Sequence, residues 1–159
     1  MTRAVVWVDG SGLAKAGPAG AGYVARVDGG SRVEDSVSIE AGTNQVAELV
    51  AAAYALEQLG PFDDVVVWSD SEYVVKGMTR WLPNWVERDW RTASGSPVKN
   101  QEHWRRLIAA AGRHGRVEFR WCKGHADTWE NNRADVLAGR ARLRAERAAV
   151  AARYSELRR

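Results

Sequence analysis

The alternation of apolar and polar positions predicts an α/β domain whose N-terminal half is rich in strands. Residues 5–8 and 65–68 are dense apolar runs, which are typical of strands buried on both faces. Residues 28–31, Asp-Gly-Gly-Ser, are a hairpin signal, so we place the first three strands in an antiparallel meander. The glycine-rich segment 10–22 is interpreted as a long turn between the first two strands. The predicted strands cover residues 5–9, 23–27, 32–40, 65–70 and 116–121.

Helical periodicity predicts helices over residues 43–59, 71–77 and 100–114, and a last helix that begins near residue 127. Thr43 and Asn100 stand at predicted helix starts and are residue types that N-caps prefer. Asp127 followed by Glu130 resembles a capping box. The pattern therefore predicts three helices between the strands and one after them.

The helix predicted over residues 43–59 is apolar nearly all round, and Glu48 is almost the only charge on its less apolar side. Such a helix is usually buried, where an ionised glutamate is costly without a partner. From the helix alone, two interpretations stay open. Glu48 is either partly exposed and favoured by the helix dipole, or it belongs to a buried site.

Composition limits the class of protein. A chain of 159 residues fits one domain of ordinary size. No apolar run reaches 18 residues, so no membrane span is expected. The first residues lead straight into a strand pattern rather than a signal peptide, and the single cysteine, Cys122, cannot form an internal disulfide. We therefore expect an intracellular, cytoplasmic protein.

Charge divides the chain into two parts. Residues 1–139 hold 16 Lys and Arg against 18 Asp and Glu, whereas residues 140–159 hold 7 Arg against 2 Glu. We therefore predict a globular domain over residues 1–139 and an Arg/Ala-rich helical extension over residues 140–159. The extension has three interpretations that stay open: an amphipathic helix docked on the body, an electrostatic anchor on nucleic acid, or a dimer seam.

Both buried apolar runs end in an aspartate, Asp9 and Asp70. If the two strands are neighbours, the carboxylates lie about 5 Å apart, which is unfavourable unless a cation lies between them. This pair favours the buried interpretation of Glu48, and Asp135 on the last helix adds a fourth carboxylate. Carboxylates without further Cys or His ligands favour Mg²⁺ or Mn²⁺ over Zn²⁺. Four carboxylates can hold two ions about 4 Å apart, the arrangement used for in-line displacement at phosphorus.

Seven motifs in order resemble those of type 1 ribonuclease H over about residues 4 to 139. The resemblance implies a five-stranded mixed sheet flanked by helices and hydrolysis of the RNA strand of RNA·DNA hybrids. The motifs are Asp9-Gly10-Ser11, Thr43-Asn44-Gln45-Val46-Ala47-Glu48-Leu49, Ser69-Asp70-Ser71-Glu72-Tyr73-Val74, Trp81-Leu82-Pro83-Asn84-Trp85, Pro97-Val98-Lys99-Asn100, Trp121-Cys122-Lys123-Gly124-His125-Ala126 and Glu130-Asn131-Asn132-Arg133-Ala134-Asp135.

The resemblance implies that Asp9, Glu48, Asp70 and Asp135 are catalytic residues that bind two Mg²⁺ ions, or Mn²⁺ in their place. One ion would lower the pKa of a bound water that attacks the scissile phosphate, and the other would stabilise the departing 3′ oxygen. The products would carry a 5′-phosphate and a 3′-hydroxyl. His125 would assist proton movement or product release, and a plain surface histidine is the alternative.

The resemblance also implies the substrate contacts. Gly10, Ser11, Asn44 and Gln45 would lie along the RNA minor-groove face, where a 2′-hydroxyl distinguishes RNA from DNA. The pair that would bind a phosphate of the DNA strand is Thr43 and Asn100, for which helix capping is the alternative role.

The tryptophans at 81, 85 and 90 form either a satellite packing cluster or, in part, a platform for nucleic acid, and Trp81 is our candidate for the platform.

Two departures from the family pattern affect the predicted affinity. Residues 13–18 lack the Asn-Pro-Gly pattern common in the family, so an Asn contact to the substrate is expected to be missing. The handle, residues 86–96, holds two Arg against Glu87 and Asp89, whereas the bacterial version is rich in lysine. We therefore predict weaker hybrid binding with a shallower salt dependence.

The preferred function is a metal-dependent endoribonuclease that acts on RNA·DNA hybrids as a monomer without an obligate protein partner. A non-cleaving hybrid-binding module with the same fold is one alternative, and another ribonuclease-H-like nuclease that acts on DNA is the second. The four carboxylates favour an enzyme, because a binding module has no need of a crowded anionic cluster.

Overall fold

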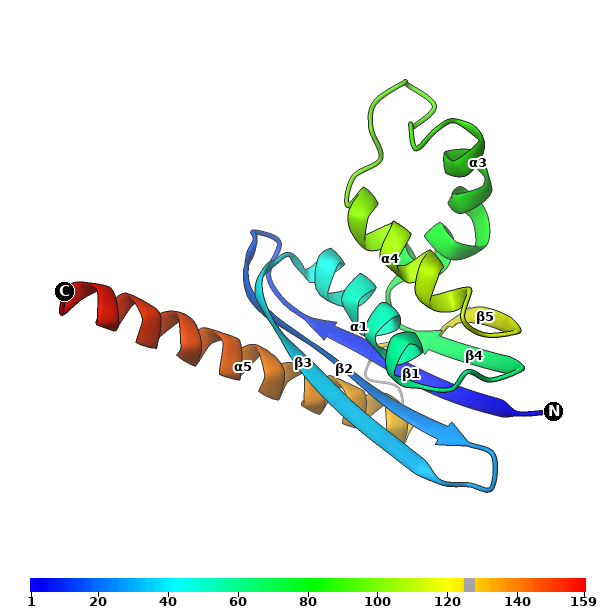
Figure 1. Ribbon diagram of the computed structural model, residues 1–159, viewed down its shortest axis with the longest axis horizontal. Helices are drawn as coiled ribbons and strands as arrows, with labels where there is room; N and C mark the ends of the chain where they lie inside the picture. The colour runs from blue at the N-terminus through cyan, green and yellow to red at the C-terminus, as the bar shows by residue number, and fades with distance from the viewer. Residues whose placement is uncertain (125–127) are drawn as a thin grey trace.

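The computed structural model describes residues 1–124 and 128–159. Its centre is a five-stranded sheet with the order β3-β2-β1-β4-β5 (Figure 1). The antiparallel meander consists of β1 (Arg3–Ser11), β2 (Gly17–Val27) and β3 (Arg32–Gly42). On the other side of β1, β4 (Asp64–Ser69) and β5 (Arg116–Trp121) pair in parallel. The predicted mixed sheet is confirmed.

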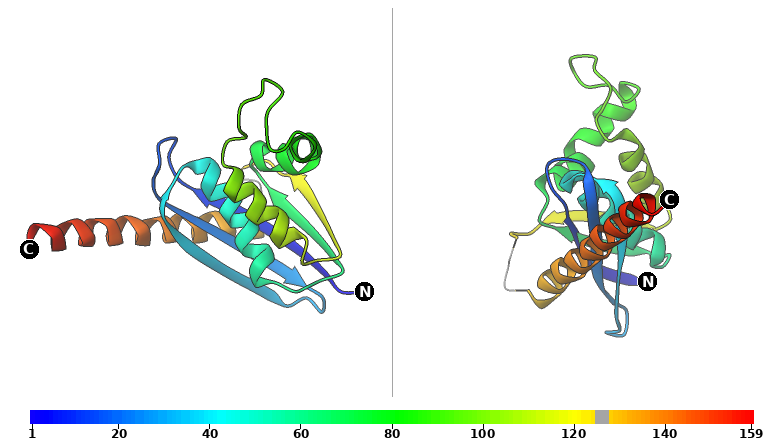
Figure 2. Two further views of the ribbon diagram at one scale, coloured as in Figure 1. Left: turned by 45° about the horizontal axis from the view of Figure 1, so that its top comes forward. Right: turned by 90° about the vertical axis from the view of Figure 1, so that its left-hand side faces the viewer.

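Helices cover both faces of the sheet. On one face lies α1 (Asn44–Gln58), with α4 (Gln101–Ala111) packed beside it. On the other face, α5 (Trp129–Leu157) crosses β2 and β3 (Figure 2). Three short segments lead from β4 to the handle, and they are α2 (Glu72–Lys76), the π-helix η1 (Gly77–Trp81) and α3 (Leu82–Glu87).

The main core lies between the sheet and α1. Residues 51–53 and 55 of α1 are all alanine and are buried, because small side chains let the helix lie close to the sheet on one side and to α4 on the other. Alternate residues of β2 face the two layers: Ala21 and Tyr23 join this core, whereas Val24 packs against Leu137 of α5. The all-round apolar pattern of α1 therefore reflects burial on nearly every side.

The prediction of a long turn over residues 10–22 is wrong. β1 continues to Ser11 and β2 begins at Gly17, so only residues 12–16 connect them. A Cβ atom at Gly20 would lie 2.3 Å from the carbonyl oxygen of Ala138, and one at Gly22 would lie 2.8 Å from the Ala138 nitrogen. These glycines stand inside a strand because the backbone of α5 lies directly on it.

One predicted helix end is also wrong. The helix predicted to reach His114 ends at Ala111, and the His114 ring is buried, with Nε2 2.9 Å from the carbonyl oxygen of Leu56. The last helix begins at Trp129, close to the predicted start, and Glu130 forms an ion pair with Arg26 of β2. Asp127 lies outside the described residues.

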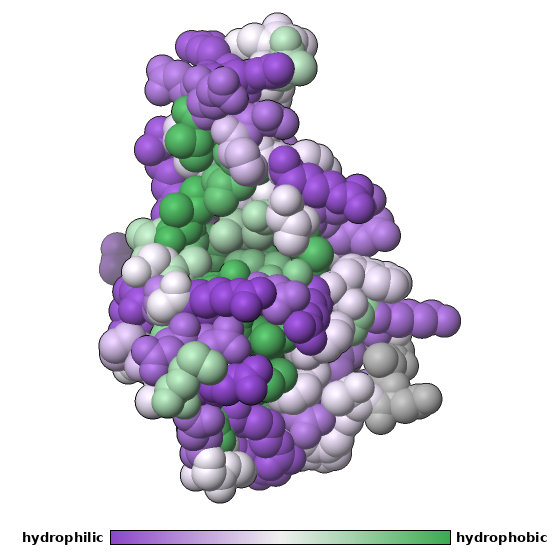
Figure 3. Space-filling view, turned by 90° about the vertical axis from the view of Figure 1, so that its right-hand side faces the viewer, coloured by the Kyte–Doolittle hydropathy of each residue, from purple (hydrophilic) through white to green (hydrophobic). Residues whose placement is uncertain are grey.

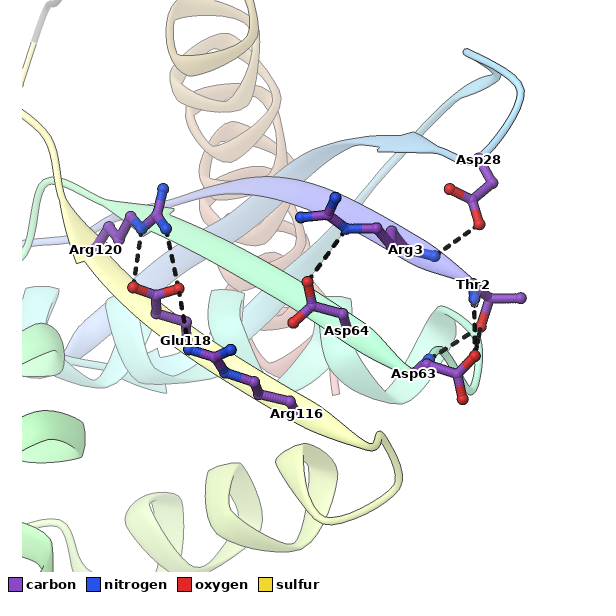
Figure 4. Close-up of polar contacts among 8 residues, drawn as sticks. All are labelled: Thr2, Arg3, Asp28, Asp63, Asp64, Arg116, Glu118 and Arg120. Atoms are coloured by element: carbon purple, nitrogen blue, oxygen red, sulfur yellow. Dashed lines mark hydrogen bonds and ion pairs between the residues drawn. The ribbon is translucent and has the colours of Figure 1, made fainter.

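Charged side chains cover the end of the sheet opposite to the carboxyl ends of β1 and β4 (Figure 4). Asp63 accepts a hydrogen bond from the backbone N–H of Thr2, and Asp64 pairs with Arg3. On the edge strand β5, Glu118 pairs with Arg120, and such charges protect an open sheet edge from further pairing. On this side of the molecule, apolar residues gather in a strip that runs up toward the handle (Figure 3).

Helix α5 has no break at residue 139, where the charge of the chain changes. Its last buried residue is Ala145, but Ala148, Ala149 and Ala152 still line a hollow with Ser38 and Glu40 of β3. The end of the helix then projects beyond the sheet (Figure 1). The docked interpretation of the extension therefore holds fully as far as Ala145 and only in part beyond it. Within the described part of the chain, the search for a helix long and apolar enough to span a membrane finds none.

Candidate active site

Asp9 and Asp70 lie side by side at one edge of the sheet. In the parallel pairing of β1 with β4, Val8 is opposite Ser69, so the next residue of each chain segment is an aspartate. Asp9 is buried and Asp70 is half-buried. One carboxylate oxygen from each of Asp9, Glu48 and Asp70 lies within 4.8 Å of the other two.

Glu48 reaches this pair from α1. The Gly10 N–H donates to Asp9 Oδ1 over 2.9 Å and to Glu48 Oε1 over 2.7 Å. A Cβ atom at Gly10 would lie 2.4 Å from the carbonyl carbon of Ala47, so glycine is required where α1 meets β1. Glu48 is only 4% exposed, and the interpretation of a partly exposed glutamate is therefore wrong.

The site is strongly anionic and largely removed from water. Burial raises the pKa of Asp9, and the charges of Glu48 and Asp70 raise it further. Burial and the charge of Asp70 likewise raise the pKa of Glu48. Like charges in a desolvated site resist ionisation unless a cation compensates them.

One buried atom of the cluster fits a bound cation. Glu48 Oε2 is buried and has no hydrogen-bond partner among the described residues. Buried acceptors without a donor are rare in native proteins, and carboxylate oxygens are the ligands that hard divalent cations prefer. The donor set therefore fits Mg²⁺ or Mn²⁺.

Asp135 completes the set of four predicted carboxylates. It projects from the second turn of α5, is exposed, and lines the same cavity of about 320 Å³ as Asp9, Glu48 and Asp70. A hydrogen bond with Asp135 adds to the pKa increase of Asp9, after burial and the charges of Glu48 and Asp70. The fold thus brings together four acidic side chains, from β1, α1, α5 and the loop after β4.

His125 lies outside the described residues.

Sequence reasoning missed Asn131 in this cavity. Asn131 is 3% exposed and lines the cavity together with Ser71 and the carboxylates. The Cys122 thiol donates to Asn131 Oδ1 over 3.6 Å. Asn131 lies one helical turn before Asp135, so the i, i+4 spacing from a predicted ligand could have identified it.

A second hollow of about 640 Å³ adjoins the carboxylate cavity, and Asn44 lines both. It brings together the predicted substrate residues Thr43, Asn44 and Gln45, and it adds Lys99, which the sequence analysis did not single out. Thr43 Oγ1 also accepts a hydrogen bond from the Val46 N–H, so its predicted capping role is confirmed. Gly10 lines the first cavity, and Ser11 ends β1 beside it.

Asn100 and Trp81 line neither hollow. Asn100 precedes α4 but makes no side-chain capping bond, so its predicted capping role is wrong, and its Nδ2 donates to the Tyr73 hydroxyl over 3.2 Å. The Trp81 ring lies 6.1 Å from Tyr73 and 5.8 Å from Trp85. Trp81 thus belongs to an aromatic cluster that packs the handle against the body, and Asn100 donates a hydrogen bond to a member of this cluster.

Residues 1–142 match the family model described as RNase H. The chain belongs to the RNase H family. Among curated relatives, it is 47% identical to ribonuclease H of Xanthomonas oryzae pv. oryzae over 134 residues, which cover 84% of this chain and 87% of that protein. It is 43% identical to ribonuclease H of Thiobacillus denitrificans over 146 residues, which cover 91% of this chain and 98% of that protein.

Solved structures agree with the family. LC9-RNase H1, described as a type 1 RNase H with the type 2 active-site motif, is 33% identical, with a TM-score of 0.77 over 89% of this chain and 72% of that chain. The N-terminal RNase H domain of a Mycobacterium tuberculosis protein is 26% identical, with a TM-score of 0.72 over 94% of this chain and 99% of that chain. The resemblance to type 1 RNase H and the predicted fold are confirmed, and the protein is a ribonuclease of this family.

Proposed function

We propose that this RNase H hydrolyses the RNA strand of RNA·DNA hybrids with the help of two Mg²⁺ ions. The observation that carries the proposal is the buried carboxylate cluster, in which Glu48 Oε2 lacks a partner among the described residues. The fold relative LC11-RNase H1 supports the substrate class, because it was solved in complex with an RNA/DNA hybrid. That protein is 25% identical, with a TM-score of 0.64 over 89% of this chain and 98% of that chain.

The ions would be held by Asp9, Glu48, Asp70 and Asp135. When bound, they would supply an acidified water and neutralise the negative charge of the phosphate. Asp9 and Glu48 are held in place by the shared Gly10 N–H and by burial. Asp135 is exposed on α5, so its side chain can adjust when substrate arrives. Hydrolysis in this arrangement would leave a 5′-phosphate and a 3′-hydroxyl, with His125 moving a proton or assisting product release.

The second hollow would accept the nucleic acid next to the scissile phosphate. Asn44 and Gln45 are exposed there and can donate to a 2′-hydroxyl or to a base edge in the minor groove. Lys99 would contact a phosphate and contribute to a salt-dependent affinity. Gly10 and Ser11 would offer backbone groups on the RNA side. Phosphate binding to the DNA strand is assigned to Thr43 and Asn100, and Trp81 would contact the substrate only at the surface of its cluster.

One chain supplies every proposed metal ligand. We therefore infer that the catalytic unit is residues 1–139 of a single chain and that residues 140–159 act outside it. Residues 146–157 line neither the carboxylate cavity nor the hollow that adjoins it.

The test is a cleavage assay with matched substrates: an RNA·DNA hybrid, duplex RNA, duplex DNA and each single strand, with Mg²⁺, with Mn²⁺ or with a chelator. The expected result is cleavage of the RNA strand of the hybrid alone, which stops when the metal is removed. Binding of the hybrid without cleavage would overturn the proposal in favour of a binding module. Cleavage of duplex DNA at a similar rate would overturn it in favour of another nuclease of this fold.

A further inference from the structure

Helix α5 carries a surface that the catalytic site does not use. Residues 146–157, which we call the overhang, extend the helix by about 18 Å at 1.5 Å per residue. Ala145 is the last buried residue before the overhang. The end of α5 extends beyond the sheet (Figure 2). The overhang nevertheless contains Val150, Tyr154 and Leu157, which are 57%, 63% and 84% exposed. Large apolar residues on an otherwise solvated helix indicate an interaction surface.

The exposed apolar residues of α5 follow a heptad repeat. Large apolar side chains recur at intervals of seven residues on the side of α5 that faces away from the sheet. Arg140, Arg147 and Tyr154 lie between these apolar residues. Together the positions are separated by four and three residues in turn, which is the pattern of a coiled-coil seam. A hollow of about 640 Å³ runs along this side. The seam consists of Val136, Arg140, Leu143, Arg147, Val150, Tyr154 and Leu157.

We propose that the seam binds α5 of a second copy of this chain, in an antiparallel two-helix coiled coil. The apolar seam argues for this occupant, because Val150, Tyr154 and Leu157 can pack on the seam of a second copy, whereas a phosphate backbone offers no apolar surface. The residues that would overlap, 140–157, carry five Arg and two Glu, so two copies repel each other except where opposite charges meet.

The positions of the charges select the antiparallel orientation. When Arg147 lies opposite Val150 of the second copy, Leu143 lies opposite Tyr154 of that copy. Glu146 then lies next to Arg153 of the second copy, and symmetry repeats this pair at the other end of the overlap. In the parallel orientation, Arg153 would instead lie beside Arg158 of the second copy, with no acidic residue to compensate. Only the antiparallel register pairs opposite charges.

Arginine in the seam makes the association weak rather than obligate. The stem of Arg147 can pack on apolar neighbours while its guanidinium stays in water. A polar residue at a core position of a coiled coil costs stability but fixes the register. We therefore expect a concentration-dependent dimer whose two catalytic sites are each complete.

The test is the molar mass of the full chain by sedimentation equilibrium, from about 1 µM to about 500 µM. The mass is expected to rise from 17.6 kDa toward twice that value. Val150→Asp, in the seam, should weaken association by about tenfold or more. Ala152→Asp, on the opposite side of the helix, is the matched control and should change the dissociation constant of the dimer by less than about twofold. A mass of one chain throughout, or equal effects of the two variants, would overturn the proposal.

Charge reversal tests the register. Glu146→Arg and Arg153→Glu should each weaken association, and the double variant should restore it because opposite charges face each other again. Glu146 also accepts a hydrogen bond from Arg142 of the same helix, so the helix content of each variant is measured by circular dichroism. Failure of the double variant to restore association, at unchanged helix content, would overturn the antiparallel register. These readouts do not depend on RNA cleavage.

Discussion

The backbone N–H of Gly10 and Oε1 of Glu48 are joined by a 2.7 Å hydrogen bond, which ties α1 to β1 at the carboxylate cluster. The same N–H donates to Asp9, so one backbone group positions two proposed metal ligands. Because a carboxylate that accepts a backbone hydrogen bond keeps a defined orientation, the site is organised before any cation binds.

Gly10→Ala should disturb the contact between α1 and β1. The new methyl group would lie 2.4 Å from the Ala47 carbonyl carbon, so α1 must shift, at a cost of about 1–3 kcal/mol in the free energy of unfolding and a large loss of activity. Denaturant unfolding and the hybrid cleavage assay measure the two effects. Gly17→Ala is the matched control, because nothing lies within 4 Å of a Cβ atom there. Equal behaviour of the two variants would contradict this account of Gly10.

Without metal, the stability of the protein should fall as pH rises. Burial and the charge of Asp70 raise the pKa of Glu48 from 4.5 to about 8, so the folded state binds a proton that the unfolded state has released. The stabilisation is complete below pH 4.5 and is lost as pH rises through about 8. Glu48→Gln should therefore raise the free energy of unfolding near pH 8, by on the order of 2 kcal/mol, and flatten its pH dependence.

Urea unfolding in a chelator at several pH values tests this sign. Glu57→Gln is the opposite control, because a hydrogen bond from Arg106 lowers the pKa of Glu57 and its ionised form stabilises the fold above the usual carboxyl pKa. That variant should lose stability at neutral pH. If Glu48→Gln also lost stability at pH 8 without metal, the electrostatic description of the cluster would be wrong.

Asp70→Asn should abolish turnover and leave hybrid binding largely intact. The amide keeps the shape of the side chain but removes one of the charges that would hold the ions, and transition-state stabilisation is lost while ground-state contacts remain. Binding is measured by fluorescence anisotropy with a labelled hybrid. Glu40→Gln, an exposed substitution on β3 away from the carboxylate cavity and the hollow that adjoins it, serves as the control. Activity of the Asp70 variant near that of the unmodified protein would refute the ligand assignment.

Asn131 is expected to position the substrate or the carboxylates within the cavity. Asn131→Ala removes a buried amide that lines the site and should lower kcat/KM by about tenfold or more. Cys122→Val removes only the thiol donor that holds Asn131 Oδ1 and should have a smaller effect, of about two- to fivefold. The kinetic constants of both variants are compared with their melting temperatures. An effect of Asn131→Ala on stability alone would limit that residue to a structural role.

The salt dependence of hybrid binding should be shallow. Arg88, Arg91, Glu87 and Asp89 are all exposed in the handle and carry no net charge together. A double variant, Glu87→Lys with Asp89→Lys, should steepen the slope of log K against log[salt] by up to about 2, at roughly 0.9 for each new phosphate contact. Deletion of residues 146–159 removes four Arg and two Glu, a net charge of +2, and should leave the slope the same or shallower. A steep slope that survives this deletion would contradict the prediction.

Local sequence was enough to predict most of the fold. Val5 to Val8 and Val65 to Val67 identify the central strands because a strand buried on both faces needs continuous apolar residues. Thr43 marks the start of α1 because its hydroxyl satisfies a free N–H at the helix terminus. The glycines of β2 misled the prediction, since glycine in a turn and glycine under a packed helix look alike in sequence. The reason for Gly20 and Gly22 is α5, which lies more than a hundred residues away along the chain.

The functional site was likewise predictable from the sequence only in part. Apolar runs that end in Asp9 and Asp70, and a lone glutamate in an apolar helix, were sufficient to name the carboxylates, because unpaired charges in apolar surroundings require a compensating partner. Sequence favoured the burial of Glu48 without establishing it, and it missed Asn131 and Lys99. Only the tertiary structure decided these points, because they depend on distances between segments that are far apart in the chain. This holds for burial, for the lining of a cavity, and for the lack of a partner for Glu48 Oε2 among residues 1–124 and 128–159.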